Sequence, residues 1–262
     1  QWKVPLMAAV ETRRSPKVAM LVTRMDIGGV PDHIMTLLSG LCGAFDFTLI
    51  CDHVLPVHAE RLAALGITFR ELKMSRTLSP LADYRSLRQL LRILKEEQID
   101  LVHTHTSKAA LLGALAARLR RRPVSVNTAH NLGFIAMPNP VVKALFWLYD
   151  RTLFALGTDA VIVVSQFVEQ RALAVRLIAR KKLHVIHNGI LDANVRRREI
   201  ALPDPAGKVK EIICVARLVW FKGLHTLIDA MPQIVSRHPQ ARLRIAGDGE
   251  LENTLRQQVE KL

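Results

Sequence analysis

The feature that most constrains this chain is a regular alternation of short apolar runs with longer segments of helical period. The apolar runs are rich in β-branched residues and predict strands at residues 17–23, 45–52, 67–72, 99–106, 123–130, 159–165 and 183–190. The segments between them predict helices at residues 30–42, 57–66, 81–98, 108–120, 140–156 and 166–179. Near-continuous apolar strands that alternate with helices are typical of a parallel sheet covered on both faces. We therefore expect residues 17–190 to form a Rossmann-like, doubly wound α/β domain.

Two of the predicted helices carry extensive apolar surface. The apolar face of the helix at 81–98 consists of Leu81, Tyr84, Leu87, Leu91 and Leu94. The helix at 140–156 is apolar around most of its circumference, and its aromatic residues are Phe146, Trp147, Tyr149 and Phe154. We favour burial of this second helix between the sheet and a neighbouring helix; insertion into a membrane interface is the alternative.

After residue 190 the alternation stops and then restarts. Residues 191–208 contain prolines and charges without a sustained period and are predicted to form a linker. The alternation resumes with strand 210–216, helix 224–237, strand 241–247 and helix 250–261. A doubly wound sheet usually has about five or six strands, so residues 209–262 are expected to form an incomplete second Rossmann-like domain. Residues 1–16 are assigned to an N-terminal extension.

The composition indicates a folded protein with an anionic partner. Half of the 262 residues are hydrophobic, which is ample for buried cores. The formal net charge of +14 indicates nucleotide phosphate, anionic lipid or nucleic acid as the partner. The three cysteines form no close metal-binding pair and are expected to be free thiols in a reducing, cytoplasmic setting. No apolar run reaches the roughly 18 residues that a transmembrane helix requires.

Glycines follow the first predicted strand, in the stretch "MDIGGVPDH". Ligands of open parallel sheets bind at the carboxyl ends of the strands, where loops lead into helices. Gly28 and Gly29 would let the backbone approach a phosphate or a sugar closely. The stretch lacks the G-x-G-x-x-G spacing of a dinucleotide site, and a simple tight turn is the alternative.

Histidines end the next two strands of interest. His103 and His105 share a face by the two-residue period of a strand, an arrangement that suits a metal ion. No third ligand is recognisable, so we expect no metal and interpret both residues as lining a cleft. His130 ends the strand at 123–130, where its imidazole would hydrogen-bond a sugar hydroxyl; a histidine satisfied by the backbone is the alternative.

Basic residues follow the first strand of the second domain, in the stretch "VARLVWFKG" at residues 215–223. The guanidinium group of Arg217 and the ammonium group of Lys222 match phosphate oxygens. Gly223 precedes a helix whose free amides favour an anion. The stretch "AGDGE" ends the neighbouring strand with Gly247 and Gly249. Together these residues predict a diphosphate pocket.

These motifs resemble those of the retaining glycosyltransferases of family 4, which have two facing Rossmann-like domains, the GT-B fold. The matching stretches are "GGVPDH", "VHTHTSKAALLGALAA", "NTAHNLGF", "VIVVSQFVEQ", "VIHNGI", "VARLVWFKGLHTLIDAM" and "LRIAGDGELENTL". They occur in the family's order over residues 17–262.

The resemblance implies a role for each matched residue. Arg217 and Lys222 would hold the diphosphate of a UDP- or GDP-linked sugar donor and stabilise the leaving group as charge develops on it. Gly28 and Gly29 would lie by the diphosphate on the acceptor-side domain, 17–190, and His130 would contact the transferred sugar. Gly247 and Gly249 would border the nucleotide. No cofactor or metal is implied, because the nucleotide-sugar is a substrate and Arg and Lys supply the charge.

One part of the family's pattern has no match here. The family carries two glutamates seven residues apart in a segment that would follow Leu262, and Glu250 and Glu252 do not correspond to them. We therefore expect a C-terminally truncated chain with partial or no transferase activity. A UDP-sugar 2-epimerase on a similar scaffold and a non-catalytic remnant that binds a carbohydrate or nucleotide are the alternatives.

The acceptor implied by the resemblance is a glycan or a lipid-linked sugar, used in polysaccharide, glycolipid or cell-envelope biosynthesis. Between Arg176 and Lys210, nine Lys or Arg residues accompany three acidic residues, which makes this stretch a candidate for anionic lipid at the inner membrane face. A solvated basic surface is the alternative. Nucleic acid is not expected as a partner, because no basic residues are interleaved with exposed aromatics and no recognised module is present.

Overall fold

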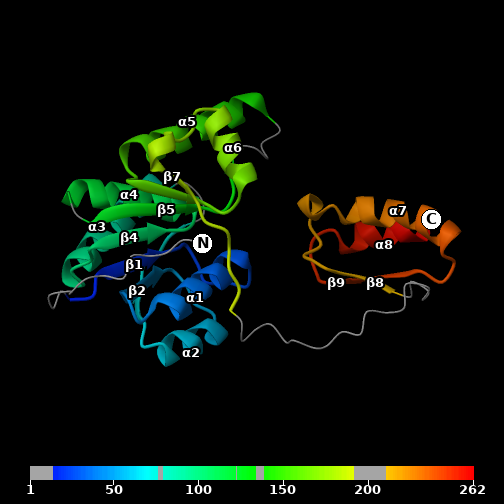
Figure 1. Ribbon diagram of the computed structural model, residues 1–262, viewed down its shortest axis with the longest axis horizontal. Helices are drawn as coiled ribbons and strands as arrows, with labels where there is room; N and C mark the ends of the chain where they lie inside the picture. Colours follow the sequence, from blue (N-terminus) through cyan, green and yellow to red (C-terminus); the bar gives the residue numbers. More distant parts are fainter. Residues whose placement is uncertain (1–13, 76–78, 122, 134–138, 192–210) are drawn as a thin grey trace, which may run out of the picture. The chain divides into compact units, whose positions relative to one another are not determined.

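The computed structural model describes residues 14–75, 79–121, 123–133, 139–191 and 211–262. The chain divides into two compact units, Gln1–Arg196 (unit 1) and Arg197–Leu262 (unit 2), and each is described by itself (Figure 1). The predicted linker at 191–208 and the predicted extension at 1–16 lie almost wholly outside the described residues, so these boundaries stay predictions.

Unit 1 is built on one parallel sheet. Its strands are β1 (Lys17–Leu21), β2 (Asp46–Cys51), β3 (Thr68–Glu71), β4 (Leu101–Thr104), β5 (Val124–Ala129), β6 (Ala160–Val163) and β7 (Leu183–Val185). They lie in the order β3-β2-β1-β4-β5-β6-β7, and every neighbouring pair is parallel. The predicted doubly wound sheet is confirmed, with each strand shorter than its apolar run.

Helices cover the sheet of unit 1 on both faces. They are α1 (Gly29–Leu41), α2 (Pro56–Ala64), α3 (Pro80–Glu96), α4 (Ser107–Arg120), α5 (Pro140–Leu156) and α6 (Gln166–Ala174). Alternate residues of β1 enter different cores: Val18 and Met20 pack with α1 and α2, whereas Ala19 and Leu21 pack with α3 and α4. Side chains of β1 thus alternate between the two faces of the sheet, and each face packs against its own layer of helices.

The order of the strands reverses between β1 and β4. The chain proceeds from β1 toward β2 on one side and from β4 toward β5 on the other, so the loops after β1 and β4 lead to opposite faces. The main-chain N–H of His105 donates to the carbonyl of Leu21 at 3.1 Å. The hydroxyls of Thr23 and Thr106 lie 2.6 Å apart across the same gap. This reversal is the position at which open α/β sheets bind ligands.

Unit 2 contains two parallel strands and two helices in its described part. These are β8 (Glu211–Val215), β9 (Arg242–Ala246), α7 (Leu224–Arg237) and α8 (Glu252–Glu260), with a 3-10 turn at Trp220–Lys222. Both helices lie on one face of this sheet (Figure 1). Leu218, Leu224, Ile228 and Leu255 form the core between them and the sheet. The other face exposes 66% of Ile213 and 80% of Val215. The described residues of unit 2 therefore cover one face of their sheet, as expected for an incomplete Rossmann-like domain.

Two helical segments differ from the prediction. Helix α6 ends at Ala174, not at residue 179, because Arg176 adopts a left-handed conformation with φ 51°. The N–H groups of Arg176 and Leu177 then donate to the carbonyls of Leu173 and Ala172, which closes the helix in a Schellman motif. In α3, the buried residues are Ser86, Leu90, Ile93 and Leu94, and the predicted face is wrong at its start because Leu81 and Tyr84 are exposed.

Helix α5 also differs from the favoured prediction, because most of it is exposed. Its C-terminal residues Leu153 and Phe154 are buried in a core shared with α4 and α6. The outer face instead exposes Val141, Leu145, Phe146 and Leu148. The contacts of α5 with the rest of unit 1 thus lie mainly toward its C-terminal half. No helix in the described part of the chain has the length and apolar character needed to cross a bilayer.

A glycine in α4 allows the close approach of this helix to the sheet. A Cβ atom on Gly113 would lie 2.5 Å from Cγ2 of Thr104 and 3.2 Å from Cγ1 of Val102. We expect Gly113→Ala to lower the free energy of unfolding by about 1–3 kcal/mol, because the helix must shift to relieve the overlap. Urea unfolding followed by circular dichroism measures this change.

The matched control is Gly40→Ala in the last turn of α1, where an added Cβ meets nothing within 4 Å. This variant should be neutral or stabilised by up to about 1 kcal/mol, because alanine has the higher helix propensity. Equal effects of the two substitutions would contradict the close α4–sheet packing.

Candidate functional site

The first group of candidate residues surrounds the N-terminus of α1, directly after β1. Gly28 caps the helix with φ 156°, and Gly29 is its first residue. A Cβ atom at either position would meet nothing within 4 Å, so open space lies beside both glycines. The free amides and the positive end of a 13-residue helix border this space, an arrangement that favours an anion.

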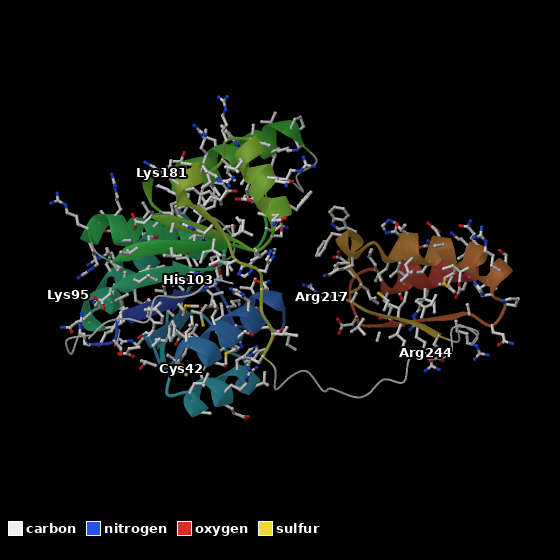
Figure 2. All side chains as sticks on the ribbon, viewed as in Figure 1. Cys42, Lys95, His103, Lys181, Arg217 and Arg244 are labelled. Atoms are coloured by element: carbon white, nitrogen blue, oxygen red, sulfur yellow. The ribbon has the colours of Figure 1, made fainter. Side chains whose placement is uncertain are left out.

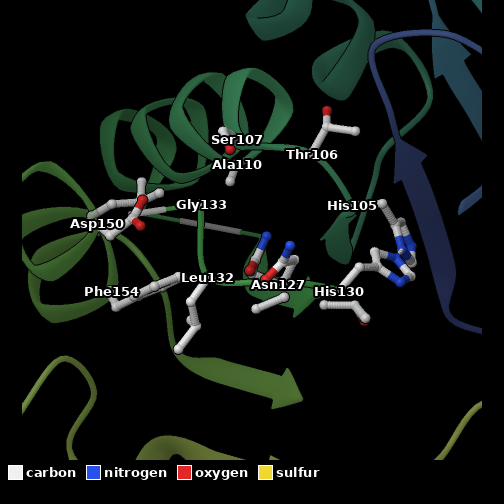
Figure 3. Close-up of a pocket in the computed structure, with 14 residues that line it drawn as sticks. His105, Thr106, Ser107, Ala110, Asn127, His130, Leu132, Gly133, Asp150 and Phe154 are labelled. Carbon is white, nitrogen blue, oxygen red and sulfur yellow. Dashed lines mark hydrogen bonds between the residues drawn. The ribbon is translucent and has the colours of Figure 1, made fainter. Parts of the chain in front are cut away.

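Four histidines gather next to this helix. His33 comes from α1, His103 from β4, His105 from the loop after β4, and His130 from the loop after β5. Nδ1 of His105 lies 3.3 Å from Nε2 of His130, and the ring of His33 stands edge-on to that of His130 at 4.9 Å. The rings of His103 and His105 lie 4.2 Å apart. Figure 3 shows the side chains of His105 and His130 directed toward one another.

Burial keeps these imidazoles neutral. Desolvation, together with nearby His33 and His130, lowers the pKa of His103 to about 4. Desolvation and His33 lower the pKa of His130 to about 4. The pKa of His105 lies well below its usual value, mainly because the ring is buried. Neutral imidazoles both donate and accept hydrogen bonds, which suits contact with hydroxyl groups.

A polar cavity of about 270 Å³ lies beside His130 (Figure 3). Ser107 from the start of α4, Asn127 from β5 and Asp150 from α5 contribute polar groups to its lining. Burial raises the pKa of Asp150 to about 6, so this carboxylate is ionised above that pH. The cavity thus offers hydroxyl, amide, imidazole and carboxyl groups, the set that binds a polyhydroxy ligand.

Hydrogen bonds hold the walls of this cavity in place. Nδ2 of Asn127 donates to Oγ1 of Thr104 at 2.8 Å, and Oγ1 of Thr128 lies 2.7 Å from Nε2 of His103. The buried ammonium of Lys108 pairs with both oxygens of Asp83 at 2.6–2.7 Å. These bonds tie the ends of β4 and β5 to each other and α4 to α3, so the lining is pre-organised.

In unit 2, the candidate basic residues follow β8. Arg217 and Lys222 are both exposed, and neither forms an ion pair with another described residue. Lys222 ends the 3-10 turn, and Gly223 then adopts a left-handed conformation with φ 69° as the N-cap of α7. Two free cations and a helix N-terminus therefore follow one another along the chain, as an anion site requires.

Gly247 and Gly249 lie against the loop that carries Arg217. The N–H of Leu218 donates to the carbonyl of Asp248 at 2.7 Å, and that of Ala216 donates to Ala246. Both glycines have positive φ, 154° and 151°. A Cβ atom on Gly247 would overlap the carbonyl oxygen of Ala216, and one on Gly249 would lie 2.5 Å from that of Leu218. These two positions require glycine, and together they bring the two strand-end loops into contact.

The structure groups the predicted residues within each unit. It places Arg217 beside Gly247 and Gly249 in unit 2 and His130 beside His105 in unit 1. Gly28 and Gly29 form the start of α1, the helix that carries His33. The functional roles of all these residues stay predictions.

Sequence reasoning missed three groups of this site. His33 lies one helical turn after Gly29 and ends the stretch "GGVPDH", so its spacing from the glycines was the available signal. For Asn127, the signal in the sequence was a polar residue within an otherwise apolar strand. Asp150 carried no signal, because its approach to the cavity depends on the packing of α5.

Two family profiles match consecutive parts of the chain. The profile described as Glycosyltransferase Family 4 matches residues 27–192. The profile described as Glycosyl transferases group 1 matches residues 196–262. The first match includes the histidine cluster and the cavity, and the second includes Arg217, Lys222, Gly247 and Gly249.

Characterised relatives include a UDP-Gal:alpha-D-GlcNAc-diphosphoundecaprenol alpha-1,3-galactosyltransferase of Escherichia coli. It is 30% identical over 226 residues, which are 81% of this chain and 56% of the relative. The capsular polysaccharide biosynthesis glycosyltransferase CapM of Staphylococcus aureus is 26% identical over 70% of this chain and 50% of its own length. The chain thus spans about half the length of these relatives.

Solved structures share the fold. The Anabaena protein HepE, crystallised with UDP and glucose, superposes with a TM-score of 0.66 at 18% identity, over 94% of this chain and 66% of that one. A putative UDP-N-acetylglucosamine 2-epimerase from Listeria monocytogenes superposes with a TM-score of 0.57 at 13% identity, over 95% and 66%. At these identities the likeness shows the fold alone.

The lowered histidine pKa values predict a loss of stability in mild acid. Histidines of the unfolded chain titrate near about pH 6.5, whereas burial lowers the pKa of His103 and His130 to about 4 in the folded protein. Between these values the unfolded chain binds more protons, so the free energy of unfolding falls as pH falls from about 6.5 to 4. Each such histidine contributes up to about 1.4 kcal/mol per pH unit.

The variant His130→Gln should therefore flatten this dependence. Urea unfolding at intervals between pH 5 and pH 7 measures the slope, and the exposed His184→Gln serves as the control. An unchanged slope in His130→Gln would contradict the burial of this imidazole in its neutral form.

Proposed function

This chain belongs to glycosyltransferase family 4, and we propose that the protein transfers a sugar, with retention, from a nucleotide-diphosphate sugar to a glycan or lipid-linked acceptor. One observation carries the proposal. In the segment that matches the group 1 profile, Arg217 and Lys222 follow β8 and form no ion pair with any acidic residue that the structure describes. Figure 2 labels Arg217. The adjacent loop contains two positions that only glycine can fill. The names of the relatives, which include a galactosyltransferase and a capsular polysaccharide enzyme, support polysaccharide, glycolipid or cell-envelope biosynthesis.

In the proposed reaction, Arg217 and Lys222 bind the diphosphate of the donor. Negative charge develops on this group as the glycosidic bond breaks. Two fixed cations and the N-terminus of α7 stabilise that charge more in the transition state than in the bound donor. Gly247 and Gly249 let their loop pack against the backbone of Ala216 and Leu218, which keeps the loop that would border the nucleotide next to Arg217.

The groups of unit 1 suit recognition of sugars. His130 is neutral at physiological pH and borders the cavity, so its imidazole can hydrogen-bond a sugar hydroxyl. Asp150, Asn127 and Ser107 line the same cavity and provide further acceptors and donors for hydroxyl groups. Gly28 and Gly29 expose the N-terminus of α1 to an anion such as phosphate.

A UDP-sugar 2-epimerase is the alternative function, because a solved structure of a putative 2-epimerase has a similar fold. That likeness concerns the fold alone, whereas the family profiles favour a transferase. Incubation with a UDP-sugar in the absence of acceptor distinguishes the two functions: an epimerase converts the sugar, and a transferase leaves its configuration unchanged.

The exposed face of α5 supports a peripheral association with the inner face of the cytoplasmic membrane. Val141, Leu145, Phe146 and Leu148 are exposed apolar residues of α5 on a strongly basic chain of net charge +14. Basic surfaces attract anionic headgroups, and an exposed apolar helix face inserts into the headgroup boundary. Five of the nine basic residues counted between 176 and 210 lie outside the described residues, so α5 carries this part of the proposal.

The donor site predicts nucleotide binding that depends on charge. UDP and GDP should each be titrated into the protein by isothermal calorimetry. The double variant Arg217→Ala, Lys222→Ala should bind the preferred nucleotide at least about tenfold more weakly, because two charge-assisted contacts are lost.

The matched control is Arg237→Ala with Arg242→Ala. Arg237 ends α7 and Arg242 begins β9, so this pair removes the same charge from the opposite end of these elements. Equal weakening by both double variants would show a general charge effect and contradict the proposed site.

The membrane proposal predicts sedimentation with anionic liposomes. Leu145→Gln with Leu148→Gln should weaken partitioning about tenfold, because two exposed leucines no longer enter the interface. Leu41→Gln with Val57→Gln changes exposed residues of α1 and α2 and is the control. Partitioning that is equal in both variants would contradict docking through α5, and partitioning insensitive to salt would contradict attraction of the basic chain to anionic headgroups.

A further inference from the structure

Three of the clustered histidines share a geometry that hydrogen bonding within the cluster does not explain. His33, His105 and His130 each offer a ring nitrogen, and these three atoms lie within 4.8 Å of one another. The contact between His105 and His130 uses one nitrogen of each ring. Nε2 of His33 and Nε2 of His105 are buried and have no hydrogen-bond partner among the described residues.

A buried imidazole nitrogen without a partner is costly. A ligand shared with Nδ1 of His105 and Nε2 of His130 would give the His33 ring a partner. Three different segments supply the rings: α1, the loop after β4 and the loop after β5. The strand order of the sheet places β4 next to β1, from which α1 follows, and places β5 on the other side of β4. The fold therefore brings the nitrogens together before any ligand arrives.

We propose that His33, His105 and His130 form a binding site for a divalent transition-metal ion, with Zn²⁺ as the preferred occupant. Tetrahedral zinc holds imidazole nitrogens at about 2.0–2.1 Å, which places neighbouring ligand nitrogens about 3.3–3.4 Å apart. The separation of Nδ1 of His105 from Nε2 of His130 is 3.3 Å. The third nitrogen, from His33, lies within 4.8 Å of the other two, so it must move closer to complete the set.

The chemistry of the donor set selects the metal. Three nitrogen ligands suit Zn²⁺, Ni²⁺ or Cu²⁺, whereas Mg²⁺ and Ca²⁺ require oxygen ligands. His105 and His130 both line the cavity, which leaves room for a water molecule as the fourth ligand. Nε2 of His105 has no acceptor among the described residues, so the site lacks part of the outer shell that strengthens tight zinc sites. Reversible binding is the expected result.

Occupation of this site has a consequence for sugar transfer. A metal bound to His130 removes the imidazole that would otherwise contact the sugar, so Zn²⁺ and sugar would compete for the same side chain. Zinc should therefore inhibit transfer reversibly, and a chelator should restore it. This consequence rests on the proposed function, whereas metal binding itself does not.

The test measures binding directly. Zn²⁺ is titrated into the protein in competition with a chromophoric chelator, for wild type and for His33→Ala and His130→Ala. Each variant should bind at least about tenfold more weakly, because loss of an outer-shell group alone costs that much. His184→Ala, which changes an exposed histidine, should retain wild-type affinity, and Mg²⁺ should not displace Zn²⁺.

Two further measurements exclude trivial explanations. Co²⁺ should give the visible spectrum of a tetrahedral nitrogen site without a thiolate charge-transfer band, and Cys42→Ser should not change the affinity, since Cys42 is an exposed free thiol. Circular dichroism melting shows whether each variant is folded, and His33→Asn replaces any variant that is not. Unchanged Zn²⁺ affinity in folded His33 and His130 variants, or a thiolate band, would overturn the proposal even if the protein proved to be an active transferase.

Discussion

The parallel pairing of β1 with β4 is the interaction on which the structure of unit 1 depends. The register joins Met20 to His103 and Leu21 to Thr104, so the two strands end side by side. Because their following loops lead to opposite faces of the sheet, the space between them is filled by neither helix layer. The N-terminus of α1, the histidine cluster and one wall of the cavity all meet at this position. A one-residue shift of β4 against β1 would turn the side chain of His103 toward the other face of the sheet, so the four histidines would no longer lie together.

Unit 2 uses the same principle with fewer elements. Parallel pairing of β8 with β9 aligns their carboxyl ends, and main-chain hydrogen bonds continue into the loops as far as Leu218 and Asp248. The loops approach so closely that Gly247 and Gly249 cannot carry a side chain. This closeness turns two separately weak sequence features, a basic loop and a glycine pair, into one surface. The basic loop and the glycine pair therefore lie together, as the proposed diphosphate site requires.

Much of this architecture follows from the sequence, because burial imposes a visible period on strands and helices. Features that depend on packing were not visible. Helix α6 ends at Ala174 because Arg176 is left-handed, and arginine gives no sequence signal for that conformation. Helix α5 is apolar but exposed, since hydrophobicity alone cannot distinguish a core from a docking surface. His33 was overlooked as a member of the cluster because it lies far along the chain from His105 and His130, and only the strand order brings them together.

The central claim is that the adjoining strand-end loops of unit 2 bind the diphosphate of a nucleotide-sugar. Nuclear magnetic resonance of the isotopically labelled chain, titrated with UDP-sugars and GDP-sugars, tests it most directly, because each backbone amide reports separately. The account predicts that one nucleotide class shifts the amides of residues 217–223 and 247–249, and that a phosphate-free sugar leaves them unchanged. Shifts spread over the basic surface, or the absence of any shift at these loops with either class, would contradict it.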